Sequence, residues 1–129
     1  MTAMVAILAV GLVVVAGLVF DGGMVLVAKR RAINTAEQAA RAGAQQLDVA
    51  AIRAGRPHRL DAPAARAAAL AYLRGAGYPG TARAHADTVE VEVAWSQPTT
   101  ILRLAGVGTQ AGTVSASARS VHGVTRQEP

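Results

Sequence analysis

Cysteine and aromatic residues are what this sequence has least of. The chain of 129 residues contains no cysteine, which excludes disulfide bonds, thiolate nucleophiles and cysteine-ligated metal sites. One Trp, two Tyr and one Phe amount to 3% aromatic residues. Proteins that bind single-stranded nucleic acid stack bases on aromatic side chains set among basic ones. We therefore expect no nucleic-acid partner, although 13 basic against 8 acidic residues give a net charge of +5.

A long uncharged run opens the chain. Residues 1–20 read MTAMVAILAVGLVVVAGLVF, and about 20 apolar residues in a helix span the roughly 30 Å of a bilayer's hydrocarbon core. A cleaved signal peptide is the alternative, but it predicts a basic segment before a shorter apolar run, then a small-residue cleavage site. Here the basic residues Lys29, Arg30 and Arg31 follow the run instead. We expect a retained single-pass anchor over residues 1–28, in contact with membrane lipid.

Asp21, Gly22 and Gly23 interrupt this apolar sequence near its end. An ionised Asp costs least in a membrane near the headgroups, so we expect Asp21 at that level. Two adjacent glycines permit a helix to bend or another helix to approach closely.

Helical periodicity continues beyond the basic triplet. It predicts an amphipathic extension of the anchor helix over residues 29–53. Small residues dominate its apolar stripe, which suits tight packing on a sheet or on sibling helices. Together with the Asp-Gly-Gly segment, the stripe forms a candidate assembly interface of nine residues: Asp21, Gly22, Gly23, Ile33, Ala36, Ala40, Gly43, Ala44 and Leu47.

The remaining residues, 54–129, predict a small α+β domain. Asp61 is placed to cap a helix over residues 64–74, and glycines at 75 and 77 end it. The alternation of TVEVEVAW (88–95) indicates a strand, with weaker strands at 82–86 and 113–121. Residues 98–104 are compatible with a helical turn. The predicted fold class is α+β: a long N-terminal helix, a second short helix and an antiparallel sheet of about three strands.

Chemistry-bearing side chains are few and scattered. His58, His85 and His122 lie far apart without the spacing of metal ligands, and Glu90 and Glu92 fit the solvated face of a strand. We expect no enzyme: no catalytic, cofactor-binding or metal-binding residues, no cofactor and no small-molecule substrate.

The order of an uncharged run, Asp-Gly, a basic triplet and INTAEQAARAGAQQL resembles the N-terminal signature of TadE/TadG-like proteins of the tight-adherence (Flp) pilus-assembly system. The matching positions are Asp21, Gly22, Lys29, Arg30, Arg31, Asn34, Ala36, Ala39, Ala40, Ala42, Gly43 and Ala44. Glu37 stands where the family usually has Asp. The resemblance implies a bacterial, single-pass, pilin-like protein whose partners are other pilins or pilus-assembly proteins, met through the N-terminal helix.

Two hypotheses on function follow. The first is a minor pilin or pilus-assembly protein, and the alternative is a membrane-tethered extracytoplasmic binding module without a filament role. The basic triplet alone would place the C-terminal domain in the cytoplasm. The resemblance implies the opposite side of the bacterial cytoplasmic membrane, and we follow it.

Overall fold

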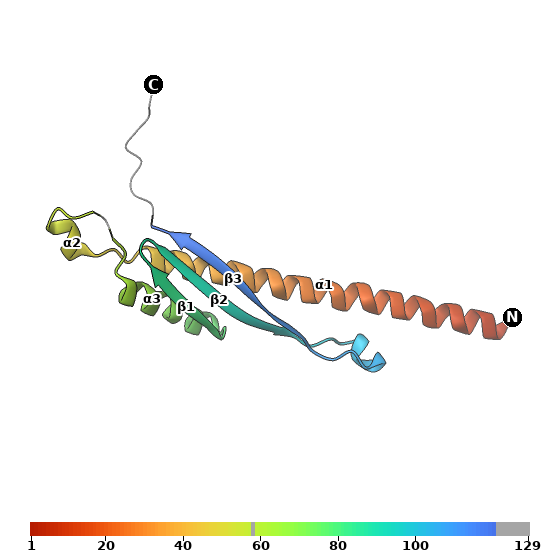
Figure 1. Ribbon diagram of the computed structural model, residues 1–129. Helices are drawn as coiled ribbons and strands as arrows, with labels where there is room; N and C mark the ends of the chain where they lie inside the picture. The colour runs from red at the N-terminus through yellow and green to blue at the C-terminus, as the bar shows by residue number, and fades with distance from the viewer. Residues whose placement is uncertain (58, 121–129) are drawn as a thin grey trace, which may run out of the picture.

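The computed structural model describes residues 1–57 and 59–120, and one long helix dominates it (Figure 1). This helix, α1, is a single element of 43 residues from Thr2 to Ala44. At 1.5 Å per residue it is about 65 Å long. The N-terminal half of α1 projects away from the other elements, which gather along its C-terminal half (Figure 1). The predicted continuity of the apolar segment with the small-residue stripe is therefore confirmed as far as Ala44.

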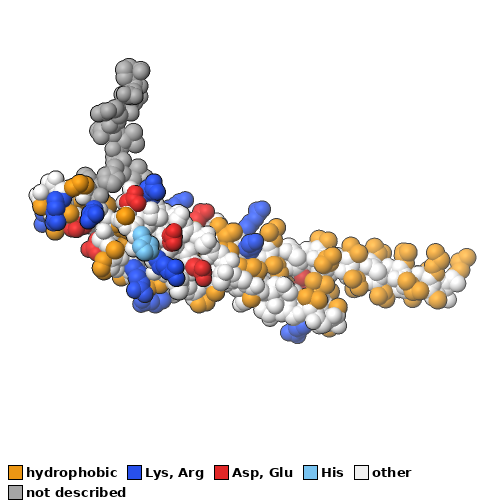
Figure 2. Space-filling view, viewed as in Figure 1, with side chains coloured by type: hydrophobic (Ala, Val, Ile, Leu, Met, Phe, Trp, Pro, Cys, Tyr) orange, Lys and Arg blue, Asp and Glu red, His pale blue; other side chains and the backbone are white. Residues whose placement is uncertain are grey.

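The projecting half of α1 is apolar, and its large side chains are uncovered. Every large hydrophobic side chain from Met4 to Phe20 is more than half exposed, and orange side chains surround this part of the helix in Figure 2. The core helix of a soluble protein is instead mostly buried, whereas here only 6% of the most apolar stretch is buried. The helix is long and apolar enough to cross a membrane once.

The prediction that this helix extends to residue 53 is wrong beyond Ala44. A separate short helix, α2, spans Val49–Arg53, and the Asp48 side chain caps it by accepting a 2.9 Å hydrogen bond from the Ala51 N–H. Leu47 pairs with Leu60 in an isolated β-bridge. Asp favours caps and turns over helix interiors because its side chain competes for backbone amides. The chain therefore turns at 45–48 before starting a new helix.

The third helix follows the expected signals. Helix α3 runs from Ala62 to Ala76, and Asp61 Oδ1 accepts a 3.1 Å hydrogen bond from the Ala64 N–H. At the other end Gly77 has φ 75°, a left-handed conformation that glycine adopts without steric cost. This helix contains the predicted range 64–74.

Three antiparallel strands form one sheet in the order β1-β2-β3. Strand β1 spans Gly80–His85, β2 spans Thr88–Gln97 and β3 spans Gln110–Arg119, with a 3-10 turn, η1, at Leu102–Ala105. In β2 the valines at 89, 91 and 93 are buried while Glu90 and Glu92 are exposed, as the alternation predicts. The α+β fold is therefore confirmed.

Helices α1 and α3 cover the apolar face of the sheet (Figure 1). Small residues supply most of the helix side of this core, so the backbones pack closely. The buried hydrophobic cluster consists of Ala32, Ala36, Ala39, Ala40, Leu60, Ala65, Ala69, Leu73, Ala82, Val89, Val91, Val93 and Val114.

Candidate functional site

Asp21 marks the point where the projecting half of α1 meets the domain. It is an acidic residue, yet it is only 2% exposed. Its Oδ1 accepts a 3.0 Å hydrogen bond from the Thr100 N–H, and its Oδ2 accepts bonds of 2.8 Å from Ile101 and 2.7 Å from Leu102. Thus one carboxylate satisfies three successive backbone donors at the start of η1. Backbone donors gathered in this way form an anion site, and here the anion is a side chain of the same protein.

The residues joining β2 to β3, 98–109, form a closed loop on this carboxylate, and we call them the Asp21-bound loop. The Thr99 side chain is buried, and its hydroxyl lies within hydrogen-bond distance of the Val107 and Gly108 carbonyl oxygens. The Val107 N–H donates to the Leu102 carbonyl at 3.0 Å. Gly106, with φ 87°, ends η1 in the left-handed conformation. The loop therefore has defined geometry and internally satisfied backbone groups.

Gly17 allows the loop to approach the helix. It is buried, and a Cβ placed on it would overlap Ile101 Cγ2 and lie 3.1 Å from Ile101 Cβ. Gly17 is one helical turn before Asp21, so the two residues lie on the same face of α1. The glycine accepts the Ile101 side chain, and the carboxylate holds the backbone beside it.

The small-residue stripe packs against the protein's own domain. Ala36 and Ala40 are completely buried. A Cβ on Gly43 would lie 2.8 Å from the Ala65 carbonyl oxygen and 3.0 Å from Val89 Cγ1, so only glycine fits there without a shift. Since α3 and the sheet occupy this face, the second half of α1 belongs to the core of the domain.

The other candidate interface residues are placed less uniformly. Ile33 and Ala44 are partly buried against the core, and Leu47 is 38% exposed. Gly22 and Gly23 are exposed, with nothing within 4 Å of an added Cβ, and α1 continues through them as one helix. Their backbone is thus open to another helix. The role of all nine residues in assembly stays a prediction.

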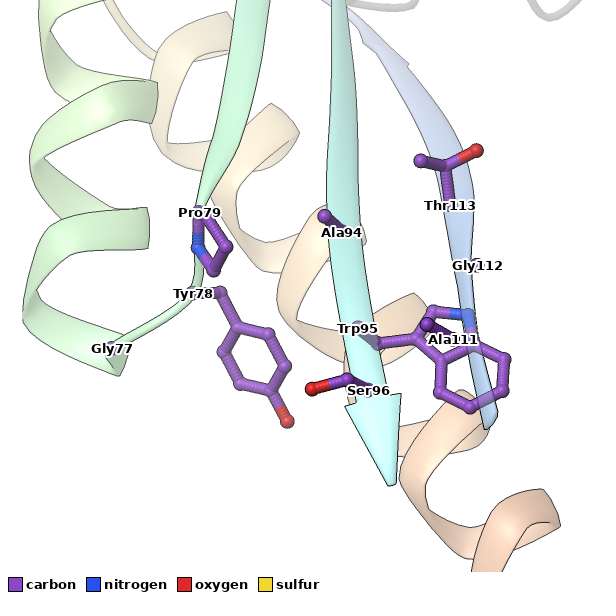
Figure 3. Close-up of a pocket in the computed structure, with 9 residues that line it drawn as sticks. All are labelled: Gly77, Tyr78, Pro79, Ala94, Trp95, Ser96, Ala111, Gly112 and Thr113. Atoms are coloured by element: carbon purple, nitrogen blue, oxygen red, sulfur yellow. The ribbon is translucent and has the colours of Figure 1, made fainter. Parts of the chain in front are cut away.

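A surface groove of about 620 Å³ is lined by β2, β3 and the turn that joins α3 to β1, residues 77–79. Figure 3 shows Tyr78 on the β1 side of β2 and the Trp95 ring extending over β3. An added Cβ on Gly112 would lie 3.3 Å from Trp95 Nε1, so glycine leaves room for the indole. That Nε1 is buried and finds no hydrogen-bond partner among the described residues.

The titratable residues weighed as catalytic or metal-binding candidates do not gather into one site. Glu90 and Glu92 lie on the exposed face of β2, and His85 ends β1. His58 and His122 lie outside the described residues. Within residues 1–57 and 59–120, no three His, Asp or Glu side chains are close enough together to hold a metal ion.

Sequence reasoning missed the bond between Asp21 and the loop. The apolar residues Ile101, Leu102 and Leu104 in the predicted turn between the last two strands indicate only that this turn packs against something. Nothing in the sequence, however, indicates that this turn folds back to an acidic residue about 80 positions earlier.

Comparison with known proteins identifies the N-terminal segment. Residues 1–46 match the family model Tad, described as "Putative Flp pilus-assembly TadE/G-like". No curated protein and no solved structure matches the chain. The matched segment comprises the projecting apolar helix, Asp21, the basic triplet and the small-residue stripe. Over residues 1–46, about a third of its length, the chain is therefore similar to the TadE/G-like proteins of Flp pilus assembly.

Proposed function

We propose that this protein is a minor pilin or pilus-assembly protein of a bacterial Flp-type system, acting by helix packing and subunit assembly and not by catalysis. The observation that carries the proposal is the division of α1. Its second half is buried by the protein's own domain, whereas its large apolar side chains from Met4 to Phe20 are more than half exposed. The family match over residues 1–46 covers both halves and supports involvement in Flp pilus assembly.

The proposal also assigns the protein a location, which follows from the same helix. Residues 1–28, with the uncharged run 1–20 in the hydrocarbon core, anchor the chain once in the cytoplasmic membrane, and the domain lies on the extracytoplasmic side, where a pilus subunit meets its partners. Gly22 and Gly23 have open space beside them, so another helix can approach there without removing any contact of this chain.

A deletion strain tests the function. Loss of the gene should abolish Flp-type pili or the secretion that depends on them, and the wild-type gene supplied in trans should restore them. Unchanged piliation would reject the proposal.

Cysteine labelling in intact cells tests the orientation. These 129 residues contain no cysteine, and Ser96 is exposed on β2, so Ser96→Cys introduces one reactive thiol among them. A membrane-impermeant maleimide should label it in intact cells. Labelling that requires cell lysis, but not denaturation, would place the domain in the cytoplasm and contradict a pilus role.

The groove beside Trp95 supports a second candidate, a membrane-tethered module that binds a cell-envelope polymer. The chain has one tryptophan, so its fluorescence reports on this groove directly. Under this reading, soluble peptidoglycan fragments titrated into the detergent-solubilised full chain should shift the emission saturably, and Tyr78→Ala should abolish the shift. Piliation would then be independent of the gene.

A further inference from the structure

We propose that the Asp21-bound loop is a second membrane contact, in which Leu104 and its apolar neighbours enter the lipid interface beside the end of the anchor. This inference rests on the proposed anchoring of residues 1–20. The loop lies far from the anchor in the sequence, and its proposed partner is the lipid surface.

The position of the loop along α1 is the first argument. Ile101 packs on Gly17, which lies inside the apolar run, and Asp21 binds the backbone of the next turn. Gly17 is about 4.5 Å along the helix axis from Phe20, the last apolar residue of the run. Because these contacts hold the loop beside the last turn of the anchor, an inserted anchor brings the loop to the membrane boundary.

The side chains that the loop exposes are the second argument. Leu104 is 90% exposed and Val107 is 41% exposed, while Ile101 and Leu102 are partly exposed. Figure 2 shows apolar surface continuing from the projecting helix onto the lobe beside it, which also carries basic side chains. Arg103 is exposed next to Leu104. An arginine adjoining apolar residues suits a lipid interface, where its stem lies among acyl chains and its guanidinium reaches a headgroup phosphate.

The backbone of the loop is the third argument, because its hydrogen bonds make contact with lipid possible. An unpaired N–H or carbonyl is costly wherever water is scarce. Asp21 accepts from the N–H groups of residues 100–102, and the carbonyls of residues 101–103 accept from N–H groups within the loop. The Thr99 hydroxyl lies at the carbonyls of residues 107 and 108. With these groups paired, the loop can lie at the acyl boundary without leaving them unsatisfied.

Depth-dependent quenching in vesicles tests the proposal on the full chain. Leu104→Cys is labelled with an environment-sensitive fluorophore and reconstituted in phosphatidylethanolamine–phosphatidylglycerol vesicles that contain nitroxide-bearing lipids. Val10→Cys, in the middle of the apolar run, is the control for the anchor. Ser117→Cys, exposed on β3, is the control for a surface in water. A nitroxide near the headgroups should quench the label at 104 several-fold more than the label at 117, and a deep nitroxide should quench the label at 10.

The possible outcomes separate this inference from the proposed function. Equal, weak quenching at 104 and 117 with strong quenching at 10 would overturn the loop contact and leave the anchor intact. Weak quenching at all three positions would overturn the anchor, and the loop contact with it. Self-quenching at 104 that increases with the protein-to-lipid ratio, without lipid quenching, would assign the loop to a second copy of the chain and overturn the lipid contact.

Discussion

The Asp21 carboxylate accepts a 2.7 Å hydrogen bond from the Leu102 backbone N–H, 81 positions further along the chain. This bond joins the end of the apolar run to the loop between the last two strands. The small domain consequently contacts α1 along its second half, from Asp21 near the middle of the helix to Gly43 near its end.

Replacing Asp21 should release the loop from the helix. Asp21→Ala removes the acceptor of three backbone donors, and hydrogen bonds to a charged group contribute about 1.5–3 kcal/mol each at most. We expect the free energy of local opening of the loop to fall by about 3 kcal/mol. The decrease should be smaller in Asp21→Asn, which keeps one acceptor oxygen. Amide hydrogen exchange at residues 100–102 measures the change. Asp61→Ala, which removes only the α3 cap, is the control and should leave these amides protected.

A side chain at position 17 should displace Ile101. Gly17→Val places atoms where Ile101 already lies, so the loop must move and its amides should exchange faster. Gly11→Val is the matched control, because nothing lies within 4 Å of a Cβ at Gly11. Equal exchange rates in the two variants would contradict the close packing of Ile101 on α1.

The small-residue stripe of α1 should not tolerate larger side chains. Ala40 lies on the face of α1 that packs on the core and is completely buried. Ala40→Leu should therefore overpack the core and lower the free energy of unfolding by about 1–3 kcal/mol. Gln38 is exposed on the other side of the helix, and Gln38→Leu should change stability little. Thermal unfolding in detergent measures both variants. Piliation of the same strains shows whether the stripe matters for assembly beyond folding.

The turn between β1 and β2 should gain stability from glycine. Ala86 has φ 50°, a left-handed conformation that costs a residue with a Cβ about 1 kcal/mol or more. Ala86→Gly should therefore raise the unfolding temperature. Ala67→Gly, at an exposed position inside α3, should lower it, because glycine costs a helix interior about 0.5–1 kcal/mol. A decrease in both variants would mean that the native turn does not strain Ala86.

Local patterns predicted those parts of the fold whose causes are local. The alternation of Val and Glu in β2, and the Asp61 and Gly77 signals that bound α3, each act within a few residues. The break after Ala44 was missed because apolar periodicity continues through Leu47. The capping of α2 by Asp48 and the pairing of Leu47 with Leu60 outweigh that periodicity. The Asp21 site was missed because it depends on how the completed sheet directs its last loop.

The continuous helix and its packing against the domain also determine how far from the membrane the protein can act. With residues 1–20 in the bilayer, the stretch from Asp21 to Ala44 rises about 35 Å, and the sheet lies alongside it and not on top of it. Since α1 is one helix through this stretch, it offers no joint at which the domain could swing outwards. While the anchor stays in a membrane, any partner of the exposed sheet face must therefore come within a few nanometres of the lipid headgroups.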